Sequence, residues 1–148
     1  MKRILGLILL LAIVLSCASI KERLAIKECK FSLISVKPYS FTFSNLKLDF
    51  EIKVDNPNTV DAVLDKFVYT FFANNTQVFT GTTGNKVEVP AKKSTQFTTT
   101  ITLEYNAIGQ AMAEAIRLGS AAYRIDARAY VSTLLGEISY PVNIELNQ

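Results

Sequence analysis

The chain has 148 residues, of which 49% are hydrophobic and 20% are charged, and it carries 16 Lys and Arg against 13 Asp and Glu. This length suits one domain that buries a core. It contains no histidine, which excludes Ser-His-Asp and Cys-His catalysis within this chain. Basic residues exceed acidic residues only slightly, and they form no cluster along the sequence. We therefore expect no nucleic-acid partner.

The N-terminus has the composition of an export signal. Two basic residues, Lys2 and Arg3, precede an apolar run from Ile4 to Leu15 that only Gly6 interrupts. This run is shorter than the roughly 20 residues of a transmembrane helix, and it is typical of the apolar region of a secretory signal peptide.

A single cysteine among small residues follows this run. The segment Val14-Leu15-Ser16-Cys17 resembles the bacterial lipobox, in which a peptidase cuts before an acylated cysteine, although a residue smaller than Leu15 is more common at that position. We therefore predict a lipoprotein signal peptide at residues 1–16 and lipid attachment to the membrane at Cys17. The alternative is an ordinary signal peptide or short anchor helix with an incidental cysteine.

The predicted anchor places the protein in the bacterial cell envelope. Ala18 follows the cysteine, where an aspartate would favour inner-membrane retention in enterobacterial lipoproteins. In a host with two membranes we therefore expect the periplasmic side of the outer membrane. Removing residues 1–16 leaves 14 basic and 13 acidic residues.

Cys29 is the second of two cysteines. Lipidation of Cys17 would leave it without an intramolecular partner, whereas a Cys17–Cys29 disulfide stays open if the signal assignment is wrong. Phe31 and Leu33 lie just beyond Cys29, so we expect a packed thiol and not a nucleophile. Residues 17–30 form the predicted lipidated tether, charged and mildly helical, and residues 31–148 form the predicted domain.

Alternation of apolar and polar residues predicts strands through most of this domain. The pattern changes phase near Ser44-Asn45, which predicts a bulge or bend, and Pro141 predicts that the last strand lies at an edge or carries a bulge. The residues predicted to point inward are Phe41 and Phe43; Leu46, Leu48, Phe50, Ile52 and Val54; Phe67, Tyr69 and Phe71; Phe97, Ile101, Leu103 and Tyr105; Tyr123, Ile125, Ala127, Ala129 and Val131; and Ile138, Tyr140, Val142, Ile144 and Leu146.

Turns and one helix complete the predicted elements. Asn56-Pro57-Asn58 predicts the chain reversal after the strand at residues 46–54, because Asn bonds to nearby backbone and Pro57 cannot continue the ladder. Residues 106–119 have helical spacing, with Asn106 as the expected cap and Gly119 as the expected end. About seven short strands with close turns predict a mainly β, two-sheet antiparallel β-sandwich with one short α-helix.

The order of elements carries a family resemblance. The strand ending in Val54-Asp55-Asn56-Pro57-Asn58 is followed by DKFVYTFFAN, KSTQFTTTITLEY, the helix and LLGEISYPVNIEL. From Phe31 to about Leu146 this order resembles the group 2 late embryogenesis abundant proteins, whose shared unit is the water-stress and hypersensitive-response (WHy) domain. The resemblance implies an immunoglobulin-like or fibronectin-III-like sandwich and a role in desiccation, osmotic or other stress.

The sequence predicts binding or protection and not catalysis. We expect no catalytic residue, no cofactor and no metal site, because the chain lacks histidine and a free cysteine pair. Thr98, Thr100 and Thr102 are expected on the outward side of one strand, where they either favour strand formation or dock a partner. Two function classes stay open: a stress-protective envelope lipoprotein with protein clients, and an accessory module that binds or assembles a specific envelope complex.

Overall fold

The computed structural model describes residues 20–133 and 136–146. The predicted signal peptide and the predicted lipid-attachment residue Cys17 lie outside the described residues. Among the described residues, no helix is both long enough and apolar enough to cross a membrane.

Strands dominate the described chain, so the predicted mainly β class is confirmed. Residues 20–25 are helical and continue into a short 3-10 helix, η1 (Ile26–Glu28), and two short helices, α2 (Tyr105–Ile108) and α3 (Gln110–Arg117), follow β7. The strands are β1 (Lys30–Tyr39), β2 (Asn45–Asp55), β3 (Ala62–Leu64), β4 (Lys66–Ala73), β5 (Thr76–Thr82), β6 (Val87–Val89), β7 (Ser94–Glu104), β8 (Tyr123–Thr133) and β9 (Gly136–Leu146).

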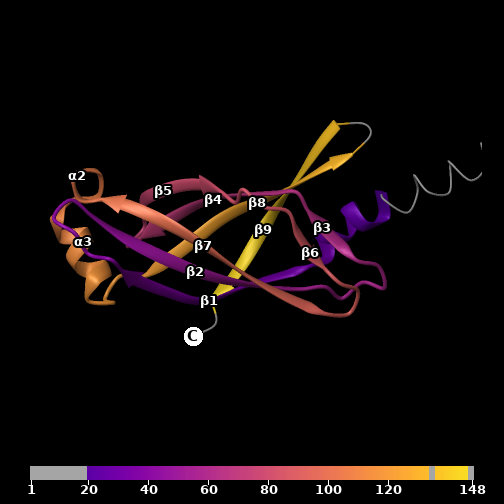
Figure 1. The fold of residues 1–148 in the computed structure, drawn as a ribbon, viewed down its shortest axis with the longest axis horizontal. Coiled ribbons are helices and arrows are strands. Elements are labelled where there is room, and N and C mark those ends of the chain that lie inside the picture. The colour runs from indigo at the N-terminus through magenta and orange to yellow at the C-terminus, as the bar shows by residue number, and fades with distance from the viewer. Residues whose placement is uncertain (1–19, 134–135, 147–148) are drawn as a thin grey trace, which may run out of the picture.

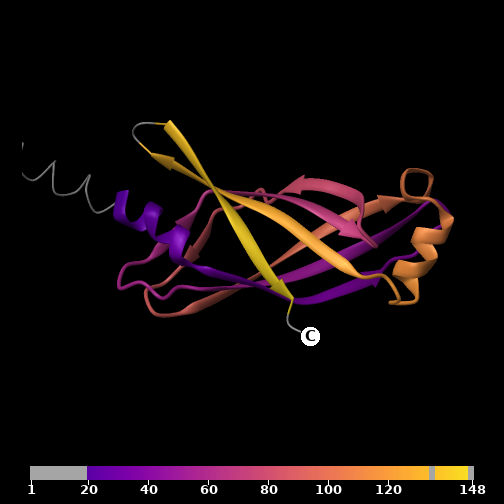
Figure 2. The same ribbon diagram turned by 180° about the vertical axis from the view of Figure 1, so that it is seen from behind.

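The long strands form one mixed sheet in the order β5-β4-β8-β9-β1-β2-β7, and β3 pairs with β6 in a small second sheet. Within the large sheet β1 and β9 run parallel, while the other neighbouring pairs are antiparallel. The large sheet is twisted and nearly closed around the core (Figures 1 and 2). The predicted antiparallel two-sheet sandwich of immunoglobulin or fibronectin type is therefore not confirmed. Alternation identifies the buried face of a strand but not its neighbour or their relative direction.

The core consists of the inward faces that alternation predicted on β2, β4 and β8. On β2, every second residue from Leu46 to Val54 is at most 1% exposed. The aromatic rings of Phe50 and Phe71 meet edge to face with centroids 4.6 Å apart, and those of Phe31 and Phe67 stack at 5.7 Å. Each such side chain contributes about 1.5–3 kcal/mol on burial, so these faces dominate the stability of the fold.

Phe41 and Phe43 do not point into the core, and this prediction is wrong. They are 47% and 107% exposed, because β1 ends at Tyr39 and the segment before β2 is a turn. The Thr42 hydroxyl accepts hydrogen bonds from the backbone N–H groups of Ser44, at 3.3 Å, and Asn45, at 2.9 Å. This local bonding makes a turn with a bend at residues 43–44, so of the predicted bulge or bend near Ser44-Asn45 the structure has the bend.

The predicted helix at residues 106–119 is two helices, broken at Gly109 with φ +80°. Asn106 lies inside α2 and makes no capping bond, so the predicted cap is wrong. Gly119 ends the segment as predicted: its φ is +67°, and its N–H donates to the Ile116 carbonyl at 3.1 Å. Ala113 and Ile116 are buried, so α3 covers one end of the sheet.

Candidate functional site

Three segments far apart in sequence meet at one end of the molecule. The helical residues 20–28, the turn after β2 and the turn between β6 and β7 lie together, while α2, α3 and the β1–β2 turn lie at the opposite end (Figures 1 and 2). We call the end formed by residues 20–28 and these two turns the tether end, because the described part of the chain starts there, at Ile20.

Asn56 joins the turns at the tether end. It is 3% exposed and is the one buried polar residue among those that the structure describes. Its Nδ2 donates hydrogen bonds of 2.9 Å to the carbonyls of Val60 and Val89, and its Oδ1 accepts bonds from the backbone N–H (2.9 Å) and Nδ2 (2.8 Å) of Asn58. Pro57, between them, is exposed. A buried amide needs such partners, so Asn56 fixes the position of both turns.

The helical segment is attached to the domain by side-chain contacts. Asn58 Nδ2 donates to the carbonyl of Ala25 at 2.9 Å, and Arg23 forms an ion pair with Asp65. Asp65 also accepts a 2.8 Å hydrogen bond from the backbone N–H of Ser132. Ala25 and Ile26 are 6% and 2% exposed, so both side chains belong to the buried core.

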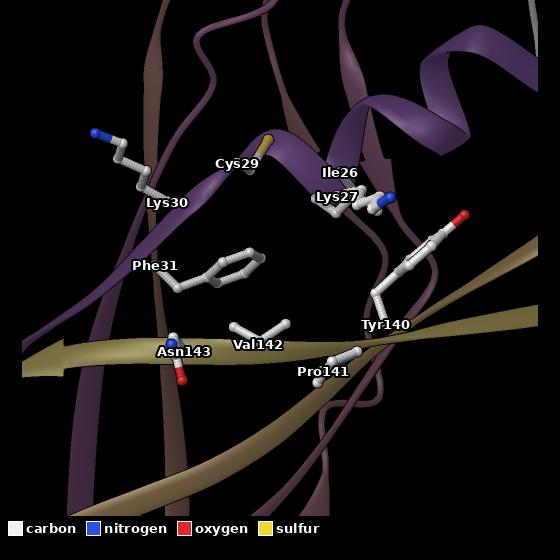
Figure 3. Close-up of a pocket in the computed structure, with 9 residues that line it drawn as sticks. All are labelled: Ile26, Lys27, Cys29, Lys30, Phe31, Tyr140, Pro141, Val142 and Asn143. Atoms are coloured by element: carbon white, nitrogen blue, oxygen red, sulfur yellow. The ribbon is translucent and has the colours of Figure 1, made fainter.

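A cleft of about 340 Å³ opens between β1 and β9 beside this segment. The two strands pair only where Phe31 to Leu33 lie beside Ile144 to Leu146. The part of β9 that precedes Ile144 has no ladder partner on β1. Pro141 therefore lies where β9 has β8 as its ladder partner on one side only, a local edge of the kind predicted. Figure 3 shows the lining residues, which are Ile26, Lys27, Cys29, Lys30, Phe31, Tyr140, Pro141, Val142 and Asn143.

Cys29 lies in the wall of this cleft as a half-buried free thiol, whose Sγ donates to the Ala25 carbonyl at 3.5 Å. Burial, followed by the negative charges of Asp55 and Glu28, raises its pKa from 9.0 to about 11. The reactive thiolate is therefore scarce at neutral pH. The thiol is packed, as predicted.

A second, more open hollow of about 390 Å³ adjoins the cleft and shares Lys30 with it. The remaining residues lining it are Asp55, Asn56, Pro57, Lys92, Lys93 and Ser94. Hydrogen bonds from Lys53 and then from Ser94 lower the pKa of Asp55, which keeps its carboxylate charged. Together the two hollows offer lysines, hydroxyls and amides, groups that bind anions by charge and hydrogen bonding, beside the Asp55 carboxylate, which pairs with Lys53.

No metal-binding cluster of three or more His, Cys, Asp or Glu side chains occurs among the described residues. Thr98, Thr100 and Thr102 are exposed on the outward side of β7, where the sequence placed them, and Thr100 donates a hydrogen bond to Asp49 on β2.

Residues 51–146 match the family model LEA_2, described as late embryogenesis abundant protein. The chain belongs to this family. LEA_2 membership suggests a stress-related role, and members of the family are typically not enzymes. A comparison with curated proteins gave no match.

Two solved structures show the same fold. The solution structure of a protein described as a late embryogenesis abundant (LEA) protein superposes with a TM-score of 0.55 at 16% identity, covering 88% of this chain and 80% of that one. A solution structure from Arabidopsis thaliana superposes with a TM-score of 0.53 at 16% identity, covering 76% of each chain. At these identities the likeness concerns the fold alone.

Proposed function

We propose that this LEA_2 protein is a non-enzymatic, lipid-anchored protein of the bacterial cell envelope whose domain, of the WHy type, protects the cell under desiccation, osmotic or other stress. Family membership is the observation that carries the proposal. The anchor is supported by the apolar run from Ile4 to Leu15 and by Cys17 after it. In a host with two membranes, the protein faces the periplasm from the outer membrane.

The outward face of β2 and β7 suggests how protection works. Across these two strands Lys47 pairs with Thr102, Asp49 with Thr100 and Glu51 with Thr98. Charged groups and hydroxyls thus alternate over a rigid sheet. When water is withdrawn, such a face offers replacement hydrogen bonds to client proteins or lipid headgroups, and the folded sheet pays little ordering entropy to do so.

A second candidate function is supported by the β1–β2 turn. Phe41 and Phe43 are exposed, yet the turn that holds them is fixed by the Thr42 hydrogen bonds and by the Tyr105 N–H, which donates to the Ser44 carbonyl at 2.8 Å. Rigid aromatic side chains are frequent anchors of protein interfaces. This turn suits an accessory module that docks on one protein of an envelope complex.

The primary proposal is tested by survival of a deletion strain through drying and osmotic shock. The strain is complemented with the native gene, with Cys17→Ala or with Cys29→Ala, which serves as the matched cysteine control. We expect rescue by the native and Cys29→Ala forms only, together with loss of palmitate labelling in Cys17→Ala alone. Equal survival of the deletion and native strains would contradict the stress role.

The accessory role is tested by crosslinking the envelope proteins in living cells. A Phe41→Ser/Phe43→Ser variant is compared with Leu118→Ser, which removes a 63% exposed apolar side chain outside the turn. One stoichiometric crosslinked partner that is lost only in the double variant would favour this second role. If no crosslinked partner depends on the turn, the accessory role is contradicted and only the protective role remains.

A further inference from the structure

The tether end carries an excess of positive charge. The lysines responsible come from separate parts of the chain and do not form a continuous basic segment in the sequence. Arg23 is paired with Asp65, and Lys53 with Asp55. Within the described residues, five lysines at this end have no carboxylate in ion-pair contact, against three carboxylates without a basic partner, those of Glu22, Glu28 and Asp61. The five are Lys21, Lys27, Lys30, Lys92 and Lys93.

The two hollows gather four of these lysines. Lys27 and Lys30 line the cleft, and Lys30, Lys92 and Lys93 line the adjoining hollow, so Lys30 lies between them. Without residues 1–16 the whole chain has only one more basic than acidic residue. The surplus of positive charge is therefore concentrated at one end of the molecule.

The length of chain before the described part places this end close to the predicted lipid. Two residues separate Cys17 from the helical segment, and nine helical residues span about 13 Å, so Lys21 and Lys27 lie within roughly 25 Å of Cys17. The Arg23–Asp65 ion pair and the hydrogen bond from Asn58 to Ala25 hold this segment to the domain. An anchored domain therefore has little freedom to turn its tether end away from the membrane.

We propose that the lysines of the tether end bind the headgroups of anionic phospholipids, so that the domain sits on the membrane by this end and presents the β1–β2 turn outward. The inference rests on the proposed lipid anchor for its position next to a bilayer. Each lysine near an anionic surface strengthens binding about fivefold. An excess of about two gives an affinity of some tens of millimolar, so this contact is weak by itself and adds to an anchor that keeps the tether end at the membrane surface.

The test uses the chain from Ile20 to Gln148, which lacks Cys17 and therefore binds membranes independently of lipidation. This chain keeps the whole described core, whose buried residues run from Ala25 to Val131, and circular dichroism checks its fold. Sedimentation with vesicles of phosphatidylcholine, with or without phosphatidylglycerol, measures binding at low ionic strength. We expect binding only when phosphatidylglycerol is present, and its loss when salt is added.

Matched variants locate the surface. Lys27→Ala/Lys30→Ala should weaken binding about 25-fold, because two lysines leave the tether end. Lys37→Ala/Lys47→Ala removes the same charge from β1 and β2 away from this end and should change binding less than about twofold. Equal losses in the two variants, or equal binding to neutral vesicles, would overturn the proposal. Binding to poly-glutamate without binding to vesicles would also overturn it and would assign the end to an acidic protein.

Failure of this inference and failure of the lipid anchor are distinguishable. Palmitate labelling of the full chain tests Cys17 and does not depend on the lysines. Vesicle binding by the chain from Ile20 tests the lysines and does not depend on Cys17.

Discussion

The hydroxyl of Tyr69 on β4 lies 3.2 Å from the hydroxyl of Thr99 on β7, joining two strands that share no backbone ladder. β7 is one edge of the large sheet, and β4 is next to the other edge. Tyr69 is 4% exposed, and burial raises its pKa above the usual 10, so both hydroxyls are protonated at neutral pH and either can donate the bond. A side-chain bond therefore helps to close the sheet where backbone pairing does not.

A double-mutant cycle measures this closure. Tyr69→Phe and Thr99→Val should each lower the free energy of unfolding by about 1 kcal/mol, and the double variant should lose less than the sum, because either change removes the same bond. Urea unfolding gives the energies. Thr70→Val is the control, since its hydroxyl bond to Thr80 at 3.3 Å is exposed and its loss should cost less than about 0.5 kcal/mol. Strictly additive losses would show that the two hydroxyls do not interact.

Asn56 is expected to be the polar side chain most sensitive to replacement. Asn56→Ala should lower the free energy of unfolding by about 3 kcal/mol, because the buried carbonyl of Val89 and the partly buried carbonyl of Val60 lose their donor. Asn56→Asp keeps an acceptor for Asn58 but sets a carboxylate against these carbonyls, so it should be at least as destabilising at pH 7 and milder near pH 4, where it takes up a proton.

Asn75→Ala is the control for the Asn56 variants. Asn75 has a φ of +63° in an exposed turn, so its replacement costs backbone strain of about 1 kcal/mol but leaves no buried group unpaired. Urea unfolding of all three variants at both pH values makes the comparison. A loss at Asn56→Ala no larger than that at Asn75→Ala would mean that the two turns are held by other contacts.

Gly81 on β5 is a test of packing beside the Tyr69 ring. A Cβ at this position would come within 2.4 Å of Phe79 Cε1 and 3.0 Å of the Tyr69 hydroxyl. Gly81→Ala should therefore displace the Phe79 ring and lower the free energy of unfolding by about 1–3 kcal/mol. At Gly84 the added carbon would meet nothing within 4 Å, so Gly84→Ala should stay within about 0.5 kcal/mol. Similar thermal midpoints for the two variants would contradict this packing.

The buried faces of β2, β4 and β8 were predictable because each strand alternates with period two over a single buried side. From Phe67 to Phe71 every second residue is at most 4% exposed, as the pattern requires. Phe41 and Phe43 alternate too, but Thr42 bonds its own turn and the two rings point to solvent. Local hydrogen bonding therefore overrode periodicity at the end of the strand.

The tether end could not be derived from the sequence because its contacts join distant residues. Asn56 bonds to Val89, and Arg23 pairs with Asp65, over separations of 33 and 42 residues. Asn-Pro-Asn indicated a turn but gave no sign of the second turn that it holds. The cleft depends on the parallel pairing of β1 with β9, a neighbour relation that hydrophobic patterns do not encode.

The thiol of Cys29 should react slowly in the folded protein. With its pKa raised by burial from 9.0 to about 11, the thiolate fraction at pH 8 falls about a hundredfold, so an aromatic disulfide reagent should label the native chain at least about a hundredfold more slowly than the urea-unfolded chain. Asp55→Asn removes a charge that raises this pKa and should speed native labelling a few-fold. Asp49→Asn is the control for this variant. Asp49 also lies on β2, opposite Thr100 of β7, and its replacement should leave the labelling rate of Cys29 unchanged.

The raised pKa of the Cys29 thiol should also make the free energy of unfolding fall as the pH rises. The folded pKa exceeds the unfolded value, so the stabilisation is fully present below pH 9 and is lost as pH rises through about 11, where the unfolded chain has already released its proton. Cys29→Ala should therefore flatten the fall in the urea midpoint between pH 9 and pH 11, and because solvent screens the half-buried thiol the effect should be smaller than about 2–3 kcal/mol. Identical pH profiles for the native and Cys29→Ala proteins, or native labelling as fast as in urea, would mean that this thiol is not shielded in the cleft wall.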